Sequence, residues 1–243
     1  MMVDWTASSR GIHDAAPDVA VLATSSIEQH GAHLPLCTDH LIATALSRLV
    51  AERLGAYLLP ALPVVSAWEH SDFKGTASLA GPTVLRVLHD VVRSLHEDGF
   101  RKVVLLNTHG GNWMVRPAAA ELNRRFPDLL LVYGGGDVLA YRGQRAVTGE
   151  LHAGDGETSA VLACAPELVK PHAVDAVPED TPASYLDYVG TAGVTPTGVW
   201  GRPTLADAGE GKRALEERAD RIAAYATETF AALESIRASA GLP

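Results

Sequence analysis

The segment from residue 28 to residue 40 concentrates side chains that could bind a metal ion or move protons. It holds two carboxylates, three imidazoles and a thiol within thirteen residues. Glu28 and His30 are two residues apart, so an extended backbone would point both to one side, and Asp39 stands at the start of a helical pattern. One imidazole and two carboxylates without a Cys-x-x-Cys pair suit Zn²⁺ or Mn²⁺. In the competing interpretation, Asp39 caps a helix and the histidines are solvated.

Two later clusters could complete such a site. Residues 107–112 read Asn-Thr-His-Gly-Gly-Asn directly after an apolar run, and residues 150–159 open a short helix that contains Glu157. A carboxylate is favoured at a helix start, and paired glycines let the backbone pass close to a ligand. Together the clusters offer Glu28, His30, Asp39, His109 and Glu157. Three carboxylates favour a two-metal site with a bridging carboxylate over a closed structural zinc site. In the alternative, His109 is a core histidine, Glu157 caps its helix and the paired glycines form a tight turn.

The elements that must position these clusters alternate between strands and helices. Apolar runs at 19–23, 102–106 and 129–133 predict buried strands. Helical spacing of apolar residues predicts helices at about 40–54, 82–99 and 211–237. This order predicts an α/β fold with a mostly parallel central sheet flanked by helices on both faces. The clusters follow strands or open helices, so they can meet at the carboxyl edge of the sheet, where open α/β sheets bind ligands.

Two stretches carry weaker signals. Pro60 and Pro63 interrupt the apolar residues 56–65, which predicts a strand that is short or lies at an edge. Glycines and prolines recur between residues 171 and 209, which predicts a long irregular excursion.

Length and charge bound the class of protein. The 243 residues, 47% of them hydrophobic, predict a single domain spanning 1–243. The formal net charge of −9 argues against nucleic acid or an anionic membrane surface as partner. Residues 1–18 lack the basic start and apolar centre of a signal peptide, and no run is long enough for a membrane span. Two cysteines make no disulfide framework, so we expect a cytoplasmic protein.

Five motifs together resemble the creatininase family of metal amidohydrolases. The family pattern Glu-Gln-His-Gly-x-His-Leu-Pro-x-x-Thr-Asp is met at residues 28–39, Asn-x-His-Gly-Gly-Asn at 107–112, and His-Ala-Gly-x-x-Glu-Thr-Ser at 152–159. Residues 73–76 (Phe-Lys-Gly-Thr) resemble its Phe-Pro-Gly-Thr, and residues 198–203 its Gly-Val-x-Gly-x-Pro. The matches occur in the family's order and span nearly the whole chain.

The resemblance implies a layered α/β fold, a homo-oligomer that is often a hexamer, and two divalent ions per chain. The ions would be Zn²⁺ and/or Mn²⁺, with Fe²⁺ as a third candidate. Carried over to this sequence, the metal ligands are Glu28, His30, Asp39 as the bridge, and His109. Creatininase has a further glutamate ligand where this chain has Gly111, and Glu157 is the expected replacement.

The remaining site residues follow from the resemblance and from the loops around it. His152 resembles the family's proton donor, and an imidazole suits that role because it titrates near neutrality. We count His152 and Glu157 as candidate catalytic residues. His33 is a candidate neighbour of the metal ligands. The candidate substrate contacts are Trp68, His70, Gly110, Gly111 and Asn112, with Trp113 and Trp200 as further pocket candidates.

We therefore expect a hydrolase that cleaves the amide C–N bond of a small molecule with a metal-activated hydroxide. Two other substrates are open within the family: a short precursor peptide, as for the mycofactocin-system peptidase, and a formamide on a pyrimidine nucleotide. Outside it, Cys37 could be the nucleophile of a cysteine hydrolase, although neighbouring carboxylates would raise the pKa of its thiol. A metal-binding subunit without catalysis is the last alternative.

Overall fold

A parallel sheet forms the centre of the computed structural model, which describes residues 1–135, 150–178 and 181–242. Within these residues the sheet has five strands in the order β1-β3-β2-β4-β5, and every neighbouring pair is parallel. The strands are β1 (Val3–Asp4), β2 (Val19–Thr24), β3 (Tyr57–Leu58), β4 (Lys102–Asn107) and β5 (Leu130–Gly135). β2 is buried along its whole length and β4 after its first residue, as expected of strands covered on both faces.

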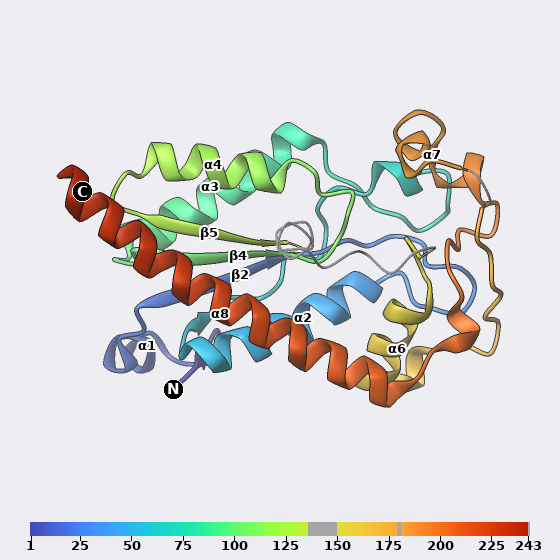
Figure 1. Cartoon of the computed structure of the whole chain (residues 1–243), viewed down its shortest axis with the longest axis horizontal. Coiled ribbons are helices and arrows are strands. Elements are labelled where there is room, and N and C mark those ends of the chain that lie inside the picture. The colour runs from blue at the N-terminus through green and yellow to red at the C-terminus, as the bar shows by residue number, and fades with distance from the viewer. Residues whose placement is uncertain (136–149, 179–180, 243) are drawn as a thin grey trace.

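Helices cover both faces of this sheet (Figure 1). The α-helices are α1 (Ser9–Ala15), α2 (Thr38–Leu54), α3 (Gly81–Glu97), α4 (Val115–Arg125), α6 (Asp155–Cys164), α7 (Leu186–Val194) and α8 (Ala208–Ala240). Short 3-10 helices are η1 (Trp68–His70), η2 (Pro166–Leu168), η3 (Ala183–Tyr185) and η4 (Pro203–Leu205). α3 and α4 lie on one face, and α2 and α8 lie on the other.

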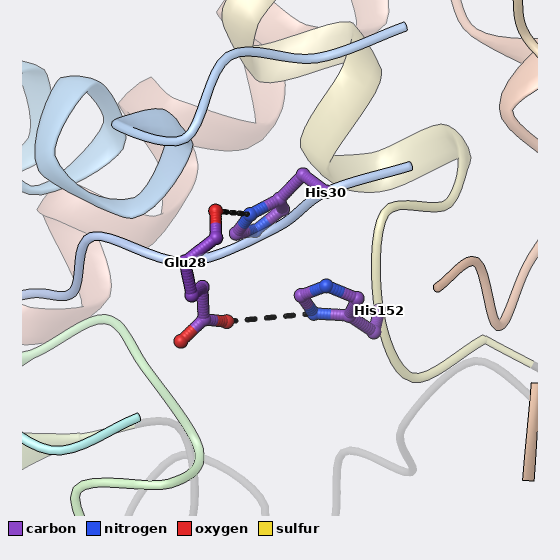
Figure 2. A group of neighbouring side chains, drawn as sticks. All are labelled: Glu28, His30 and His152. Atoms are coloured by element: carbon purple, nitrogen blue, oxygen red, sulfur yellow. Dashed lines mark hydrogen bonds and ion pairs between the residues drawn. The ribbon is translucent and has the colours of Figure 1, made fainter. Parts of the chain in front are cut away.

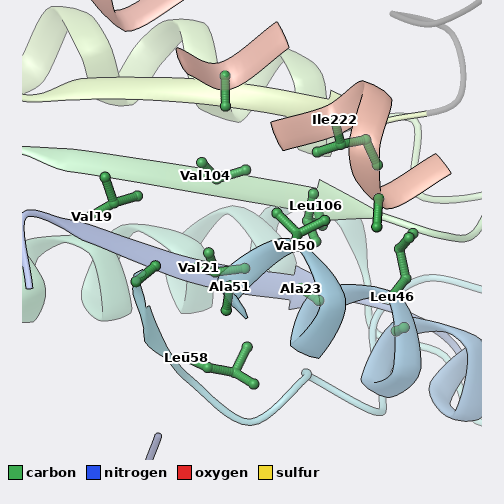
Figure 3. Packing of buried hydrophobic residues seen from close by; sticks show 14 of the residues in the cluster. Val19, Val21, Ala23, Leu46, Val50, Ala51, Leu58, Val104, Leu106 and Ile222 are labelled. Carbon is green, nitrogen blue, oxygen red and sulfur yellow. The ribbon is translucent and has the colours of Figure 1, made fainter. Parts of the chain in front are cut away.

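Alternate residues of the strands feed two separate cores. On one face Val21 and Val104 pack with Leu46 of α2 and Ile222 of α8 (Figure 3). On the opposite face the intervening strand residues, such as Leu22, pack with α3 and α4. This alternation is the two-residue period of a strand, and it holds the central strands from both sides.

The α/β fold class, the parallel sheet and the helices on both faces are confirmed. The strand within 56–65 is short, as expected: β3 is two residues long. It lies between β1 and β2 in the sheet. The irregular excursion is wrong in part, because α7 lies within it, with Gly190 at a φ of 65°. The competing interpretation, in which Asp39 caps this helix, is wrong: Cys37 is the N-cap of α2, which places Asp39 inside the first turn. In the described part of the chain, no helix is long and apolar enough to cross a membrane.

Candidate metal centre

The candidate ligands lie on loops and helix starts at the carboxyl ends of β2 and β4. Glu28 and His30 follow β2, and Asp39 is in the first turn of α2. His109 follows β4 by two residues, and Glu157 is in the first turn of α6. The structure thus brings all five sequence-predicted ligands to one edge of the sheet.

These side chains form overlapping groups whose ligand atoms lie within 4.8 Å of one another. In the described part of the chain, one group is Glu28, Asp39 and His109, and another is His30, Asp39 and Glu157. His30 Nε2 lies 3.6 Å from both Asp39 Oδ2 and Glu157 Oε2, and His109 Nε2 lies 3.0 Å from Glu28 Oε2. Two ligands of one tetrahedral ion are about 3.3–3.6 Å apart, given bond lengths of about 2.0–2.2 Å. Asp39 belongs to both groups, which is the position of a bridging carboxylate.

A third group joins Glu28, His30 and His152 (Figure 2). His30 Nδ1 lies 3.2 Å from the backbone oxygen of Glu28, so it donates there and leaves Nε2 with a free electron pair. His152 Nε2 donates to the backbone oxygen of Gln29 at 2.7 Å, and its Nδ1 lies 3.7 Å from Glu28 Oε1. Both imidazoles therefore present an unprotonated nitrogen to the centre of the site.

The donor set fits a cation, because several of its atoms are buried without a partner. Both carboxylate oxygens of Glu28, His30 Nε2 and His109 Nε2 have no hydrogen-bond partner among the described residues. Glu28 and His30 are fully buried. A buried carboxylate without a donor is costly, and a divalent cation bound among these atoms would offset that cost.

The electrostatics of the metal-free site point the same way. Burial raises the pKa of Glu28 well above its ordinary value, and burial raises the pKa of Asp39 to about 6. Burial lowers the pKa of His30, and burial lowers the pKa of His152 to about 4. For His109, burial acts in the opposite direction, but the carboxylates of Glu28 and its neighbours raise its pKa to about 10. Burial thus disfavours the charged forms of Glu28, Asp39, His30 and His152, and a bound divalent cation would favour the deprotonated carboxylates and neutral imidazoles that a metal needs.

A cavity of about 1190 Å³ opens onto the cluster. Its lining includes four of the predicted substrate contacts, Trp68, His70, Gly110 and Gly111, and also the predicted pocket residues Trp113 and Trp200. Asn112 does not line it and needs correction, because its amide instead donates to the Ser25 oxygen and accepts from the Ser66 nitrogen. Asn112 is 1% exposed and joins loop segments, so we assign it a structural role.

The cavity also bears on the cysteine alternative. Cys37 is absent from the described lining of the cavity, and its backbone caps α2. A nucleophile must reach the substrate, so this placement removes the support for a cysteine hydrolase.

Sequence reasoning missed two residues of the site. Glu69 of η1 places Oε1 3.3 Å from His109 Nε2. Gln29 donates to His70 Nδ1 at 2.8 Å and to the Gly198 oxygen at 3.0 Å. Gln29 lies inside the motif at residues 28–39 and Glu69 directly precedes His70, but the partners of both lie far away in the chain, so the motifs do not show these contacts. His33, expected beside the ligands, is buried with Nε2 3.1 Å from the Thr158 hydroxyl, so it ties the first loop to α6.

Comparisons with known proteins agree with this geometry. The profile of the family described as creatininase, creatinine amidohydrolase, matches residues 4–226. The chain is 35% identical over 228 residues to the mycofactocin precursor peptide peptidase of Mycobacterium ulcerans, covering 88% of this chain and 86% of the relative. It is 32% identical over 195 residues to the creatinine amidohydrolase of Pseudomonas putida, covering 70% and 72%.

A solved structure described as creatininase Mn superposes with a TM-score of 0.80 at 26% identity, covering 95% of this chain and 99% of the other. The family profile spans most of the chain, and the fold, motif order and buried donor cluster agree with it. The chain belongs to the creatininase family.

Proposed function

We propose that this creatininase-family hydrolase holds two divalent ions and cleaves an amide C–N bond in a short peptide. The observation that carries the proposal is the pair of buried donor groups that share Asp39 at the end of an open cavity. Glu28, Asp39 and His109 would hold one ion, and His30, Asp39 and Glu157 the other. Such a pair of ions, Zn²⁺ and/or Mn²⁺ with Fe²⁺ as a third candidate, polarises a carbonyl and lowers the pKa of a water.

His152 is suited to move a proton beside the ligands. Its imidazole is neutral at pH 7, because burial lowers its pKa to about 4, and its Nε2–H is held by the Gln29 backbone oxygen at 2.7 Å. Nδ1 is thus the free atom, and it lies 3.7 Å from Glu28 Oε1. We assign Nδ1 the task of accepting the proton of the attacking water and passing it to the leaving nitrogen. This refines the expected role of His152, which begins the cycle as a base.

The size and lining of the cavity favour a peptide over a small cyclic amide. Pockets for small molecules commonly measure about 300–1,000 Å³, and this cavity of about 1190 Å³ is larger. Trp68, Trp113 and Tyr188 line it and are 59%, 71% and 83% exposed. Exposed aromatic side chains provide apolar contact area for the side chains of a peptide. The relative from Mycobacterium ulcerans, which is named as a precursor peptide peptidase, supports the same substrate class.

A small amide such as creatinine is the second candidate, supported by the relative from Pseudomonas putida. The two are separated by incubating the metal-loaded protein with a library of short peptides, with creatinine and with a formamide, and by following the products by mass spectrometry. We expect peptide cleavage that stops on chelation. Turnover of creatinine or the formamide alone would assign the small-amide class instead.

Metal analysis tests the ligands directly. We expect about two ions per chain, and about one in Glu157→Gln, because a neutral amide replaces a carboxylate ligand. Glu121→Gln, an exposed carboxylate of the same cavity, is the matched control and should keep both ions. A parent protein that binds no ion after incubation with Zn²⁺ or Mn²⁺ would refute the proposal. The expected homo-oligomer is checked separately by light scattering.

A further inference from the structure

Glu69 of η1 lines the cavity and contacts the candidate metal centre at His109. We propose that Glu69 is a ligand of the ion that Glu28, Asp39 and His109 would hold, and that Gly111 provides the space for its carboxylate. The inference rests on the proposed function, since it assumes that this site binds an ion. It adds a ligand that no sequence motif assigns.

The carboxylate of Glu69 lies at ligand distance from His109. Glu69 Oε1 lies 3.3 Å from His109 Nε2, and Glu28 Oε2 lies 3.0 Å from the same nitrogen. These separations are close to the roughly 3.3–3.6 Å expected between two ligands of one tetrahedral ion. His109 Nε2 is buried and makes no hydrogen bond to the described residues. The three groups therefore converge on a point where polar atoms lack partners.

The backbone at residue 111 lies directly beside the Glu69 carboxylate. A Cβ atom built on Gly111 would overlap the Glu69 carboxylate and His109 Nε2, whereas one built on Gly110 would meet no atom within 4 Å. A side chain at residue 111 would therefore have to displace these groups, whereas one at residue 110 would not. A Cβ at residue 111 would occupy the space that the Glu69 carboxylate fills. Because residue 111 is glycine, the carboxylate can lie beside His109.

The ion beside His109 would have few protein donors without Glu69. The group of Glu28, Asp39 and His109 offers three ligand atoms, whereas zinc in proteins takes four or five. The Glu69 side chain is 18% exposed at the wall of the cavity, so it can supply a protein ligand while a neighbouring position stays open to water or substrate. In the alternative, Glu69 only forms an ion pair with a protonated His109.

The test is metal binding by the full-length protein, measured by elemental analysis and by calorimetric titration of the metal-free form with Mn²⁺ and with Zn²⁺. Glu69→Gln keeps the shape of the side chain and removes its charge. We expect the Kd of one of the two ions to rise at least about 100-fold, because even residues that only support a ligand cost about 10–100-fold in affinity. Gly111→Ala should also weaken binding, because its Cβ would displace the Glu69 carboxylate and crowd His109 Nε2, so only Glu69→Gln isolates the glutamate; Gly110→Ala should leave both Kd values unchanged.

A double variant shows which ion is affected. If Glu69 and Glu157 bind different ions, Glu69→Gln/Glu157→Gln should hold none tightly. If the double variant still holds one ion tightly, both residues act on the same ion and the inference is wrong. Two ions with unchanged Kd in Glu69→Gln would also overturn it and leave the binuclear proposal standing. A parent protein without metal would instead refute the proposed function itself.

Discussion

Replacing Gly211 by alanine should destabilise the fold, although a glycine-to-alanine change inside a helix usually stabilises a protein. Gly211 lies in the first part of α8, where a Cβ atom would overlap the backbone oxygen and carbon of Ser159 in α6. Replacing glycine by alanine inside a helix normally stabilises by about 0.5–1 kcal/mol, because glycine loses more conformational freedom on folding. Here the new methyl group meets backbone, which cannot turn away as a flexible side chain can.

The magnitude follows from these opposing effects. Inserting a methyl group into a close-packed interior costs about 1–3 kcal/mol, and the helix preference returns up to about 1 kcal/mol of that. We therefore expect Gly211→Ala to lower the free energy of unfolding by about 1–2 kcal/mol. For a domain of about 150–250 residues, this corresponds to a fall in Tm of roughly 2–8 °C.

The assay is calorimetry of the chelated protein, so that metal binding does not mask the change. Gly156→Ala is the matched control: this glycine is exposed in α6, and its Cβ would lie 3.7 Å from Glu150 Oε2, an ordinary contact. The control should keep the parent Tm or exceed it. Because α6 carries Glu157, Gly211→Ala should also weaken metal binding. A Tm for Gly211→Ala equal to or above that of the parent would refute the reasoning.

Two further predictions concern the site. Chelation should lower the Tm, because the buried donors bind metal only in the folded state, and added Mn²⁺ or Zn²⁺ should restore it; an unchanged Tm would contradict the donor assignment. Asp39 should contribute stability to the chelated protein as the pH falls from 7 to 5, since its folded pKa is raised to about 6 and it takes up a proton that the unfolded carboxyl binds only near pH 4; His30 and His152, whose pKa values burial lowers, act in the opposite direction. The chelated Asp39→Asn variant should therefore gain less stability, or lose more, than the chelated parent over this range; denaturant unfolding at both pH values checks this, and equal shifts in the two proteins would argue against it. Trp113→Ala should raise KM for a peptide about tenfold with little change in kcat, because this exposed residue contacts substrate away from the reacting bond; steady-state kinetics would expose the error if kcat fell instead.

The strongest local patterns in the sequence predicted the elements that carry the site. The apolar runs of β2 and β4 and the helical spacing of α3 and α8 are strong because each element buries a continuous face. The motifs then predicted that the five candidate ligands lie together at one edge of the sheet, which the structure shows. β1 could not be predicted, because two half-buried residues show no period, and it exists through pairing with β3.

The missed parts of the site depend on contacts between distant segments. Asn112 has the residue type of a substrate contact, but its amide is used by Ser25 and Ser66, far from it in sequence. Glu69 is adjacent to His70, yet its meaning depends on Gly111, which lies on another loop. Pairwise packing of this kind has no periodicity, so only the folded chain shows it.

The hydrogen bonds of Gln29 have a consequence for exchanging loops between relatives. Its side chain donates to His70 and to the Gly198 oxygen, and its backbone oxygen accepts from His152. Three loops that shape one wall of the site are thus fastened to a single residue. A chimera that imports only one of these loops would leave a buried amide group of Gln29 unsatisfied, at a cost of about 1–3 kcal/mol. Substrate preference is therefore transferable only when the three loops are exchanged together.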